Sequence, residues 1–359
     1  FIDGGADAER TVAANERAYA QRTIVPRYLV DVSNRDLGCE LFGHQLAMPL
    51  LIAPTGLARI AHPAGEIAGA RAARSAGVGF VVSSASSDSL ERVASEAGGL
   101  LWFQLYLWPD RAIVEQFVQR AASAGYGALV VTVDVPVIGN RLRDVRNGFS
   151  IPPRLSASTV ADVLRHPRWL AGMRQRLRFG NVEDLVAPGA GSMEYARFVN
   201  RMLANPAADW ATFDWIRAAW EGPLLVKGVL STEDARRAVD HGADGLIVSN
   251  HGGRQLDDAP ASLDVLPAIV EAAPTVPVLV DGGVRRGSDM LKALALGARA
   301  CLIGRPWLYG LAAAGERGVT GVLDVLRAEL DRTLALSGVP GVGSLTPEAV
   351  GYGGPGRAS

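Results

Sequence analysis

A histidine and an arginine stand three positions apart in the glycine-rich stretch SNHGGRQLD, residues 249–257. Histidine is the side chain best suited to proton transfer near neutral pH, and arginine can bind a carboxylate through two parallel hydrogen bonds. His251 and Arg254 would therefore suit a substrate whose reacting carbon is bonded to a carboxylate. Gly252 and Gly253 would let the backbone pass close to a ligand. Alone, the pair is weak evidence, because exposed loop histidines are more common than catalytic ones.

A second glycine-rich pattern, DGGVRRG (281–287) followed by IGRP (303–306), is typical of a phosphate site. Glycines leave backbone N–H groups accessible, and Arg285 and Arg305 add positive charge. Barrel enzymes often bind phosphate with the loops after their last two strands and a nearby helix N-terminus. By itself the pattern fits a sugar-phosphate or nucleotide enzyme as well as a redox enzyme.

Three further residues could take part in chemistry, and each follows an apolar run. Lys227 could form a Schiff base, or it could supply a fixed positive charge beside a flavin. Asp134 could orient a histidine and stabilise its protonated form. Tyr106 could donate a hydrogen bond to a substrate oxygen. Each residue could equally be the polar end of a strand.

The elements that would position these residues form a repeated pattern of eight apolar runs, each with a polar end and a helix-like stretch after it. Such runs are typical of parallel strands that are buried on both faces. Helical periodicity and capping residues mark 62–77, 231–243 and 286–298 between them. The runs are PLLIAPT (49–55), GFVVSS (79–84), LWFQLY (101–106), ALVVTVD (128–134), PLLVKG (223–228), DGLIVSNH (244–251), PVLVD (277–281) and ACLIGR (300–305).

This repeat predicts an α/β fold, a closed (β/α)₈ TIM barrel rather than an open doubly wound sheet, as a single domain over residues 1–359. Barrel active sites lie at the C-terminal ends of the strands, where the polar residues of this chain cluster. A long insertion after the fourth strand, residues 142–208, is expected to form a lid. We expect a flexible tail over 351–359.

Composition excludes several classes of protein. The 359 residues carry a formal net charge of −1, so no charge excess points to nucleic acid. The two cysteines form no disulfide framework, no metal-ligand spacing is present, and no apolar run is long enough for a membrane span. We expect a cytoplasmic protein. The basic and apolar segment within 155–208 suits a solvated lid or subunit contact, which we favour, or a surface that lies on a membrane.

The order of the motifs APTG, WFQLY, TVDVPVIGNR, LLVKG, SNHGGRQLD, DGGVRRGSD and IGRP resembles the FMN-dependent 2-hydroxy acid dehydrogenase/oxidase family. The resemblance extends from Gly4 to about Thr346. Within the family, MPLLIAPTG, LWFQLY and HPRW are most similar to the mandelate-oxidising members. The resemblance implies an FMN enzyme that oxidises an (S)-2-hydroxy acid to a 2-keto acid. It leaves little support for a non-catalytic flavin protein.

The resemblance also implies roles for individual residues. His251 would be the base and Asp134 its carboxylate partner, while Arg254 and Arg141 would bind the substrate carboxylate. Tyr106 would lie near the substrate, and Lys227 would lie beside flavin N1. The other implied FMN contacts are Pro54, Thr55, Gly56, Ser83, Gln104, Thr132, Ser249, Asp281, Gly283, Arg285, Gly304 and Arg305.

Four positions bear on specificity. Phe1 stands where glycolate-oxidising members have a tyrosine, Ala85 replaces a tryptophan, and Val137 replaces an arginine. The last two changes should enlarge the pocket or make it more apolar, which favours mandelate or another bulky hydroxy acid. Gly56, alanine in some oxidases, favours a quinone or electron carrier over O₂ as acceptor.

The alternatives are an L-lactate dehydrogenase, an oxidase that produces H₂O₂, and a member that acts on a modified peptide. Whichever of these holds, the small substrate and the electron acceptor are the expected partners. We also expect a homo-oligomer, a tetramer.

Overall fold

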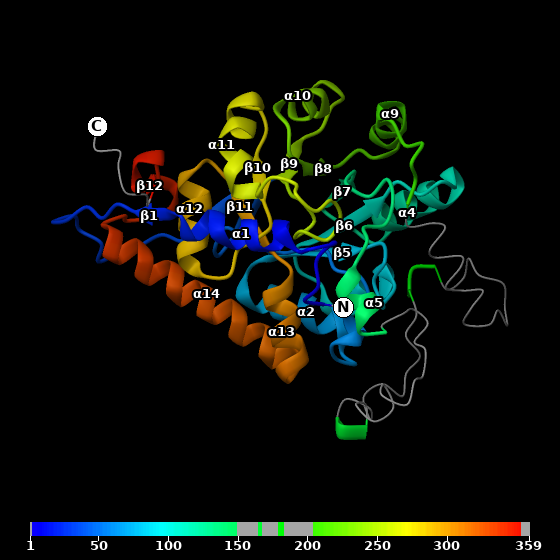
Figure 1. Cartoon of the computed structure of the whole chain (residues 1–359), viewed down its shortest axis with the longest axis horizontal. Coiled ribbons are helices and arrows are strands. Elements are labelled where there is room, and N and C mark those ends of the chain that lie inside the picture. The colour runs from blue at the N-terminus through cyan, green and yellow to red at the C-terminus, as the bar shows by residue number, and fades with distance from the viewer. Residues whose placement is uncertain (1, 149–163, 167–178, 183–203, 353–359) are drawn as a thin grey trace.

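A closed barrel of eight parallel strands forms the centre of the protein (Figure 1). The computed structural model describes residues 2–148, 164–166, 179–182 and 204–352. Pairing of the last strand with the first, with Cys301 opposite Leu50, closes the ring and confirms the predicted TIM barrel. The strands are β4 (Leu50–Ile52), β5 (Gly79–Ser83), β6 (Leu101–Tyr106), β7 (Ala128–Thr132), β8 (Leu224–Val229), β9 (Gly245–Val248), β10 (Val278–Val280) and β11 (Ala300–Ile303).

Helices surround this barrel, and their ends follow the capping residues of the sequence. The Ser231 side chain accepts a hydrogen bond from the Asp234 N–H at the start of α10, and Gly77 ends α2 in the left-handed conformation. At α12, Asp289 accepts the N–H groups of Arg285 and Arg286. The helices are α2 (Gly65–Ala76), α3 (Leu90–Ala97), α4 (Arg111–Ser123), α9 (Trp210–Ala219), α10 (Thr232–Asp240), α11 (Ser262–Ala272), α12 (Gly287–Ala295), α13 (Arg305–Ala314) and α14 (Glu316–Ser337).

The strands are buried on both faces, as their continuous apolar sequence predicts. A cluster inside the barrel includes Leu51, Trp102 and Ile247, while a larger cluster packs between strands and helices. Each fully buried aliphatic side chain contributes about 1.5–3 kcal/mol relative to an exposed one. The strand ends are therefore held on a rigid frame.

Several elements outside the barrel repeat were not predicted. Helix α1 (Arg10–Ala20) packs against α11, and a hairpin of β2 (Cys39–Leu41) and β3 (His44–Leu46) packs against the cluster inside the barrel. Near the C-terminus, η3 (Val342–Ser344) and η4 (Pro347–Ala349) are short 3₁₀ turns that precede β12 (Val350–Tyr352). Strand β12 pairs with β1 (Arg22–Ile24).

The prediction of a flexible tail from residue 351 is wrong for its first two residues. Gly351 and Tyr352 belong to β12, and Tyr352 Oη accepts a hydrogen bond from Arg22 Nη2 at 2.8 Å. The Arg22 guanidinium also lies 4.4 Å from the centre of the Tyr352 ring. Backbone pairing and this side-chain contact fix the segment, and residues 353–359 lie outside the described residues.

Most of the predicted insertion, 142–208, lies outside the described residues, as does most of the segment 155–208. Its described parts include α5 (Leu142–Arg146) and residues 179–182. That the insertion forms a lid therefore stays a prediction. In the described ranges, no helix combines the length and apolarity that crossing a membrane requires.

Candidate active site

The C-terminal ends of the strands surround one cavity of about 280 Å³. Barrel closure brings together polar residues that are distant in sequence, as the strand-end pattern predicted. The predicted site residues that line this cavity are Pro54, Thr55, Gly56, Ala85, Gln104, Tyr106, Thr132, Arg141, Lys227, His251, Arg254, Asp281, Gly283, Arg285, Gly304 and Arg305.

Two predicted flavin contacts lie behind the cavity wall instead of on it. Ser83 is buried and donates from Oγ to Gln104 Oε1 at 2.9 Å, which fixes the orientation of that amide. Ser249 is fully buried, and its Oγ accepts hydrogen bonds from Lys227 Nζ at 2.8 Å and from the His251 N–H at 3.0 Å. These serines orient groups that face the cavity.

The structure does not bring Val137 into the cavity. Its side chain is 61% exposed, and the neighbouring Val135 and Ile138 line the cavity in its place. Position in the sequence does not by itself reveal which way a loop side chain points, so the expected contact of Val137 with the pocket is not seen. Phe1, the other departure from the glycolate-oxidising pattern, lies outside the described residues.

His251 lines the cavity and is paired with Asp134, a predicted site residue that does not itself line it. His251 Nδ1 lies 2.9 Å from Asp134 Oδ1, and Asp134 is itself mostly buried. Burial by itself would raise the pKa of Asp134, but the charges of His251 and Lys227 bring it below its ordinary value. An ionised Asp134 can accept a hydrogen bond from Nδ1–H, so in the neutral imidazole Nε2 would be the nitrogen that accepts a proton.

Two partly buried arginines make this side of the cavity positive. Burial, together with repulsion from Arg141 and Arg305, lowers the pKa of Arg254 below its ordinary value. Burial has the same effect on the pKa of Arg141. Arg254 Nη1 donates to the Gly4 carbonyl oxygen at 2.6 Å, which holds the guanidinium in place. An anion bound between these arginines would offset the cost of burying their charges.

Tyr106 lies beside the histidine. Its ring is nearly parallel to that of His251, with 6.5 Å between the ring centres. Burial, and then the charge of Asp134, raises the pKa of Tyr106. The phenol therefore stays protonated and can donate a hydrogen bond.

Lys227 is a buried group whose surroundings favour its charged form. It is only 3% exposed, and Nζ lies 2.8 Å from Ser249 Oγ and 3.1 Å from Asp281 Oδ2. Burial would lower the pKa of Lys227, but Asp281 and Asp134 raise it above its ordinary value. A Schiff base requires a neutral amine, so this environment favours the fixed-charge interpretation.

The loop that carries His251 is held by α1, which the sequence did not indicate. The side-chain amides of Asn250 and Asn15 exchange two hydrogen bonds of 2.8 Å. Asp257 accepts the backbone N–H groups of Ala8 and Thr11 at 3.0 and 2.9 Å. His251 takes a left-handed φ of 58° at the centre of this loop. Contacts between residues that lie more than two hundred positions apart thus hold His251 in an uncommon backbone conformation.

Phe179 and Asn181 are site residues that sequence reasoning missed. Phe179 lines the cavity, and Asn181 is 2% exposed. Asn181 Nδ2 donates to the Ser83 carbonyl at 3.1 Å, while Oδ1 accepts the Leu90 N–H at 2.7 Å. This residue therefore fastens the described part of the insertion at 179–182 to the end of β5 and the start of α3. In the sequence, an asparagine and a phenylalanine next to a basic segment carry no signal of these contacts.

The cavity fits FMN. Among the described residues, Thr55 Oγ1, Gln104 Nε2, Thr132 Oγ1 and Asp281 Oδ1 are buried without a hydrogen-bond partner. Such atoms need partners, and a heterocycle with both donors and acceptors would supply them. At Gly304, before α13, a Cβ would meet nothing within 4 Å, so there is room at a helix N-terminus for a phosphate.

The two arginines predicted to bind that phosphate contact protein atoms in this structure. Arg305 Nη1 donates to the Gly252 carbonyl at 2.9 Å, and Arg285 Nη2 lies 3.1 Å from Glu16 Oε1. Both still line the cavity. They would hold the phosphate end of FMN, while Lys227, Thr132 and Gln104 would hold its ring.

A TIM barrel with a paired histidine, two arginines and a phosphate loop around one cavity defines an enzyme for an anionic substrate and a phosphate-bearing cofactor. The FMN-dependent dehydrogenase family model matches residues 1–352. The chain belongs to this family, and its cofactor is FMN. It is an oxidoreductase that carries out FMN-dependent oxidation of 2-hydroxy acids.

Relatives cover nearly the whole chain. It is 46% identical to the (S)-mandelate dehydrogenase of Pseudomonas putida, over 97% of this chain and 88% of that protein. It is 43% identical to glycolate oxidase 1 of Zea mays, over 96% of this chain and 89% of that protein. A crystal structure described as monotopic membrane protein (S)-mandelate dehydrogenase superimposes with a TM-score of 0.94 at 45% identity, covering 98% and 93% of the two chains.

Proposed function

We propose that this protein oxidises the (S)-enantiomer of a bulky or aromatic 2-hydroxy acid, such as mandelate, to the 2-keto acid. The observation that carries the proposal is that His251, which is paired with Asp134, lines one cavity together with Arg254 and Arg141. A carboxylate bound by the two arginines would place its neighbouring carbon and hydroxyl within reach of the histidine.

The protein's part in the reaction is to bind, orient and accept a proton. Arg254 and Arg141 hold the substrate carboxylate, and Tyr106 donates a hydrogen bond to a substrate oxygen. His251 takes at Nε2 the proton that the substrate loses, and the ionised Asp134 stabilises the resulting imidazolium. FMN, when bound, accepts the two electrons from the substrate carbon and later passes them to an acceptor.

The apolar part of the cavity supports the preference for an aromatic substrate. Ala85, Ile138 and Phe179 all line it. Ala85 leaves space where a larger residue would fill it, and Phe179 offers a ring against which a phenyl group can pack. A small acid such as glycolate would leave this part of the cavity without contacts.

Gly56 supports a quinone or an electron carrier as the acceptor. A Cβ built on Gly56 would lie 3.1 Å from both the Cβ and the carbonyl oxygen of Ala85. A methyl group at this position, as in the oxidases that have alanine here, would therefore require the Ala85 loop to shift, so the wall of this chain is shaped for glycine. If O₂ is instead the acceptor, the reduced flavin will reoxidise rapidly in air with release of H₂O₂.

The test is anaerobic reduction of the flavin by mandelate, phenyllactate, lactate and glycolate, followed by readmission of oxygen. We expect the aromatic acids to give the highest rates per unit concentration. Faster reduction by lactate or glycolate would overturn the substrate assignment. His251→Ala should keep FMN bound, shown by its visible absorbance, and reduce the flavin orders of magnitude more slowly. Reduction at the parental rate would overturn the role of His251.

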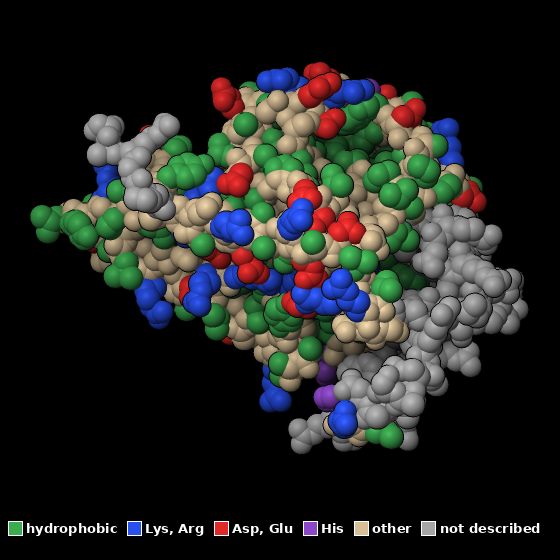
Figure 2. Space-filling view, in the orientation of Figure 1, with side chains coloured by type: hydrophobic (Ala, Val, Ile, Leu, Met, Phe, Trp, Pro, Cys, Tyr) green, Lys and Arg blue, Asp and Glu red, His purple; other side chains and the backbone are tan. Residues whose placement is uncertain are grey.

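We also propose a homotetramer that contacts membranes at their surface. The relative described as monotopic supports the membrane contact. Exposed apolar residues Val25, Tyr28 and Leu29 follow β1, and Figure 2 shows hydrophobic side chains at the tip of this arm, on the left. Such patches mark interaction surfaces. Sedimentation analysis tests the tetramer. Vesicle flotation of the full chain tests the membrane contact, and a chain that does not float would overturn it. Equal flotation of a variant without 155–208 would exclude that segment as the contact.

A further inference from the structure

Two segments meet at the cavity wall where substrate specificity is proposed to lie. One is the turn at Gly56 after β4, and the other is the loop at Ala85 after β5. The Leu57 N–H donates to the Ala85 carbonyl oxygen at 3.0 Å. A Cβ added to Gly56 would lie 3.1 Å from Ala85, closer than most Cβ contacts. A relative shift of a few tenths of an ångström would therefore change the shape of the wall.

A single buried carboxyl oxygen accepts a hydrogen bond from each of the two segments. Glu66 lies in the first turn of α2 and is 1% exposed. Its Oε1 accepts the Ala58 N–H at 3.0 Å and the Ser87 N–H at 2.8 Å. Ala58 and Ser87 each lie two residues after the positions that form the wall, Gly56 and Ala85. The mechanism proposed above gives this side chain no part in the chemistry.

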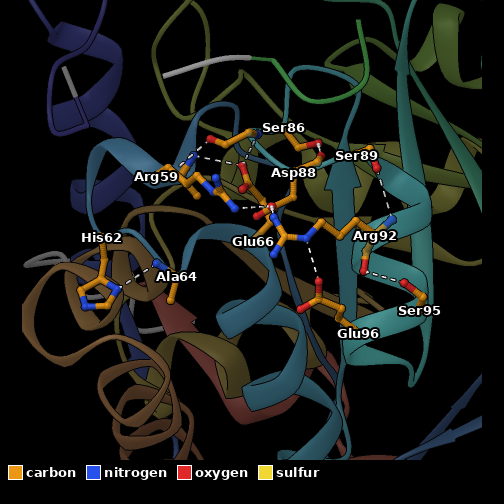
Figure 3. A network of polar contacts seen from close by, with 12 residues as sticks. Arg59, His62, Ala64, Glu66, Ser86, Asp88, Ser89, Arg92, Ser95 and Glu96 are labelled. Atoms are coloured by element: carbon orange, nitrogen blue, oxygen red, sulfur yellow. Dashed lines mark hydrogen bonds and ion pairs between the residues drawn. The ribbon is translucent and has the colours of Figure 1, made fainter. Parts of the chain in front are cut away.

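The surroundings of Glu66 strengthen the same connection. Arg59, in η1 (Ala58–Ile60), forms an ion pair of 2.6 Å with Asp88, and its N–H donates to Ser87 Oγ at 3.2 Å. Arg92 of α3 also contacts Asp88, at 3.0 Å. Figure 3 shows Glu66 and Asp88 between the two arginines. This arrangement joins η1, α2 and α3 around the two wall segments.

A carboxyl group is a costly choice for a purely structural position. A buried carboxyl group is unfavourable unless hydrogen bonds compensate it, and Oε2 of Glu66 has no partner among the described residues. A glutamate is long enough for one oxygen to reach two N–H groups from separate segments. Its two hydrogen bonds hold just the parts of the chain that flank Gly56 and Ala85.

We propose that Glu66 is a positioning residue that sets the separation of the Gly56 turn and the Ala85 loop, and thereby the room for the substrate side chain. The effect on substrate choice rests on the proposed function, in which Ala85 borders the substrate. The effect on the two backbone N–H groups does not depend on it. The two parts can therefore be tested separately.

The test compares Glu66→Ala, Glu66→Gln and the control Glu96→Gln. Glutamine keeps an oxygen that can accept both N–H groups, whereas alanine removes it. Glu96 belongs to the same polar network, where it pairs with Arg92 on the surface, but it contacts neither wall segment. Three readouts are hydrogen exchange of peptides covering 56–60 and 84–90 without FMN, the dissociation constant of FMN, and the kcat/KM ratio of mandelate to lactate.

We expect Glu66→Ala to raise exchange in both peptides about tenfold and to change the kcat/KM ratio by a similar factor, because two buried N–H groups lose their acceptor. Weaker FMN binding should accompany these changes. Below pH 7, where the parent Glu66 is protonated and as uncharged as glutamine, Glu66→Gln and Glu96→Gln should match the parent in all three readouts. If Glu66→Ala fails to fold, Glu66→Asp, whose side chain is too short to reach both groups, should show the same losses.

Unchanged exchange in the alanine or aspartate variant would overturn the proposal, even with a lowered melting temperature. A glutamine variant that behaves like the alanine variant would also overturn it. Altered exchange with an unchanged substrate ratio would overturn the effect on specificity alone. If no hydroxy acid reduces the flavin, the proposed function fails, while exchange still decides whether Glu66 holds the two segments.

Discussion

His251 Nδ1 and Asp134 Oδ1 lie 2.9 Å apart, although the two residues are separated by 117 positions and follow different strands. Asp134 is held in turn by Gln255, whose Nε2 donates to the Asp134 carbonyl oxygen at 3.2 Å. The pair joins the loops after β7 and β9. It fixes which imidazole nitrogen is available to a substrate.

Asp134→Asn should slow flavin reduction about 10³- to 10⁴-fold, because an amide cannot stabilise the imidazolium and can favour the wrong tautomer. Anaerobic stopped-flow absorbance measures this rate. FMN content should be unchanged, which serves as the control. A loss of less than about tenfold would show that the pair has a structural role only.

Arg254→Met should weaken binding of the substrate carboxylate by about 10- to 200-fold, because a charge-assisted hydrogen bond contributes about 1.5–3 kcal/mol. The measurement is the substrate concentration that gives half the maximal rate of flavin reduction. A neutral ester of the substrate is the matched control, since the variant and the parent should need nearly the same concentration of it for half the maximal rate. Equal losses for acid and ester would contradict a carboxylate-binding role.

Phe179→Ala should lower kcat/KM for mandelate about tenfold and leave that for lactate nearly unchanged, because only the phenyl group loses an apolar contact. Phe179→Leu keeps most of the apolar volume and should lie between the variant and the parent. Steady-state kinetics with both acids decides the matter. A uniform loss for both acids would point to a disturbed insertion instead of a specificity effect.

Glu66→Gln should make the protein more stable than the parent as pH rises. Burial, opposed by hydrogen bonds from Ser87 and Ala58, raises the pKa of Glu66 from 4.5 to about 7. The folded state therefore binds this proton more tightly than the unfolded state does. The stabilisation is fully present below pH 4.5 and is lost as pH rises through 7, a change of about 3 kcal/mol.

Glutamine does not titrate, so the difference in unfolding free energy between Glu66→Gln and the parent should move in favour of the variant between pH 5 and 8. Denaturant unfolding at several pH values measures it. The control is Glu96→Gln at the partly exposed Glu96, which should follow the parent. A constant difference across this range would mean that Glu66 remains ionised in the folded protein.

Most of the barrel and much of the site could be predicted because both depend on short-range patterns. Buried parallel strands need continuous apolar runs, and barrel enzymes place polar residues at the strand ends. Thr132, Lys227 and Asp281 were predicted on that basis, and all three line the cavity. Val137 was expected at the pocket but does not line it, because its position in the sequence did not reveal which way the side chain points.

The sequence by itself determined the family, the cofactor and the identity of the charged groups, since these depend on residue types in a fixed order along the chain. Tertiary structure decided which groups touch. The Asn15–Asn250 amide pair and the contact of Asn181 with the end of β5 join segments far apart in sequence, and Glu66 joins the turn after β4 to the loop after β5. No local pattern encodes such contacts, because each depends on where the closed barrel places a loop in space.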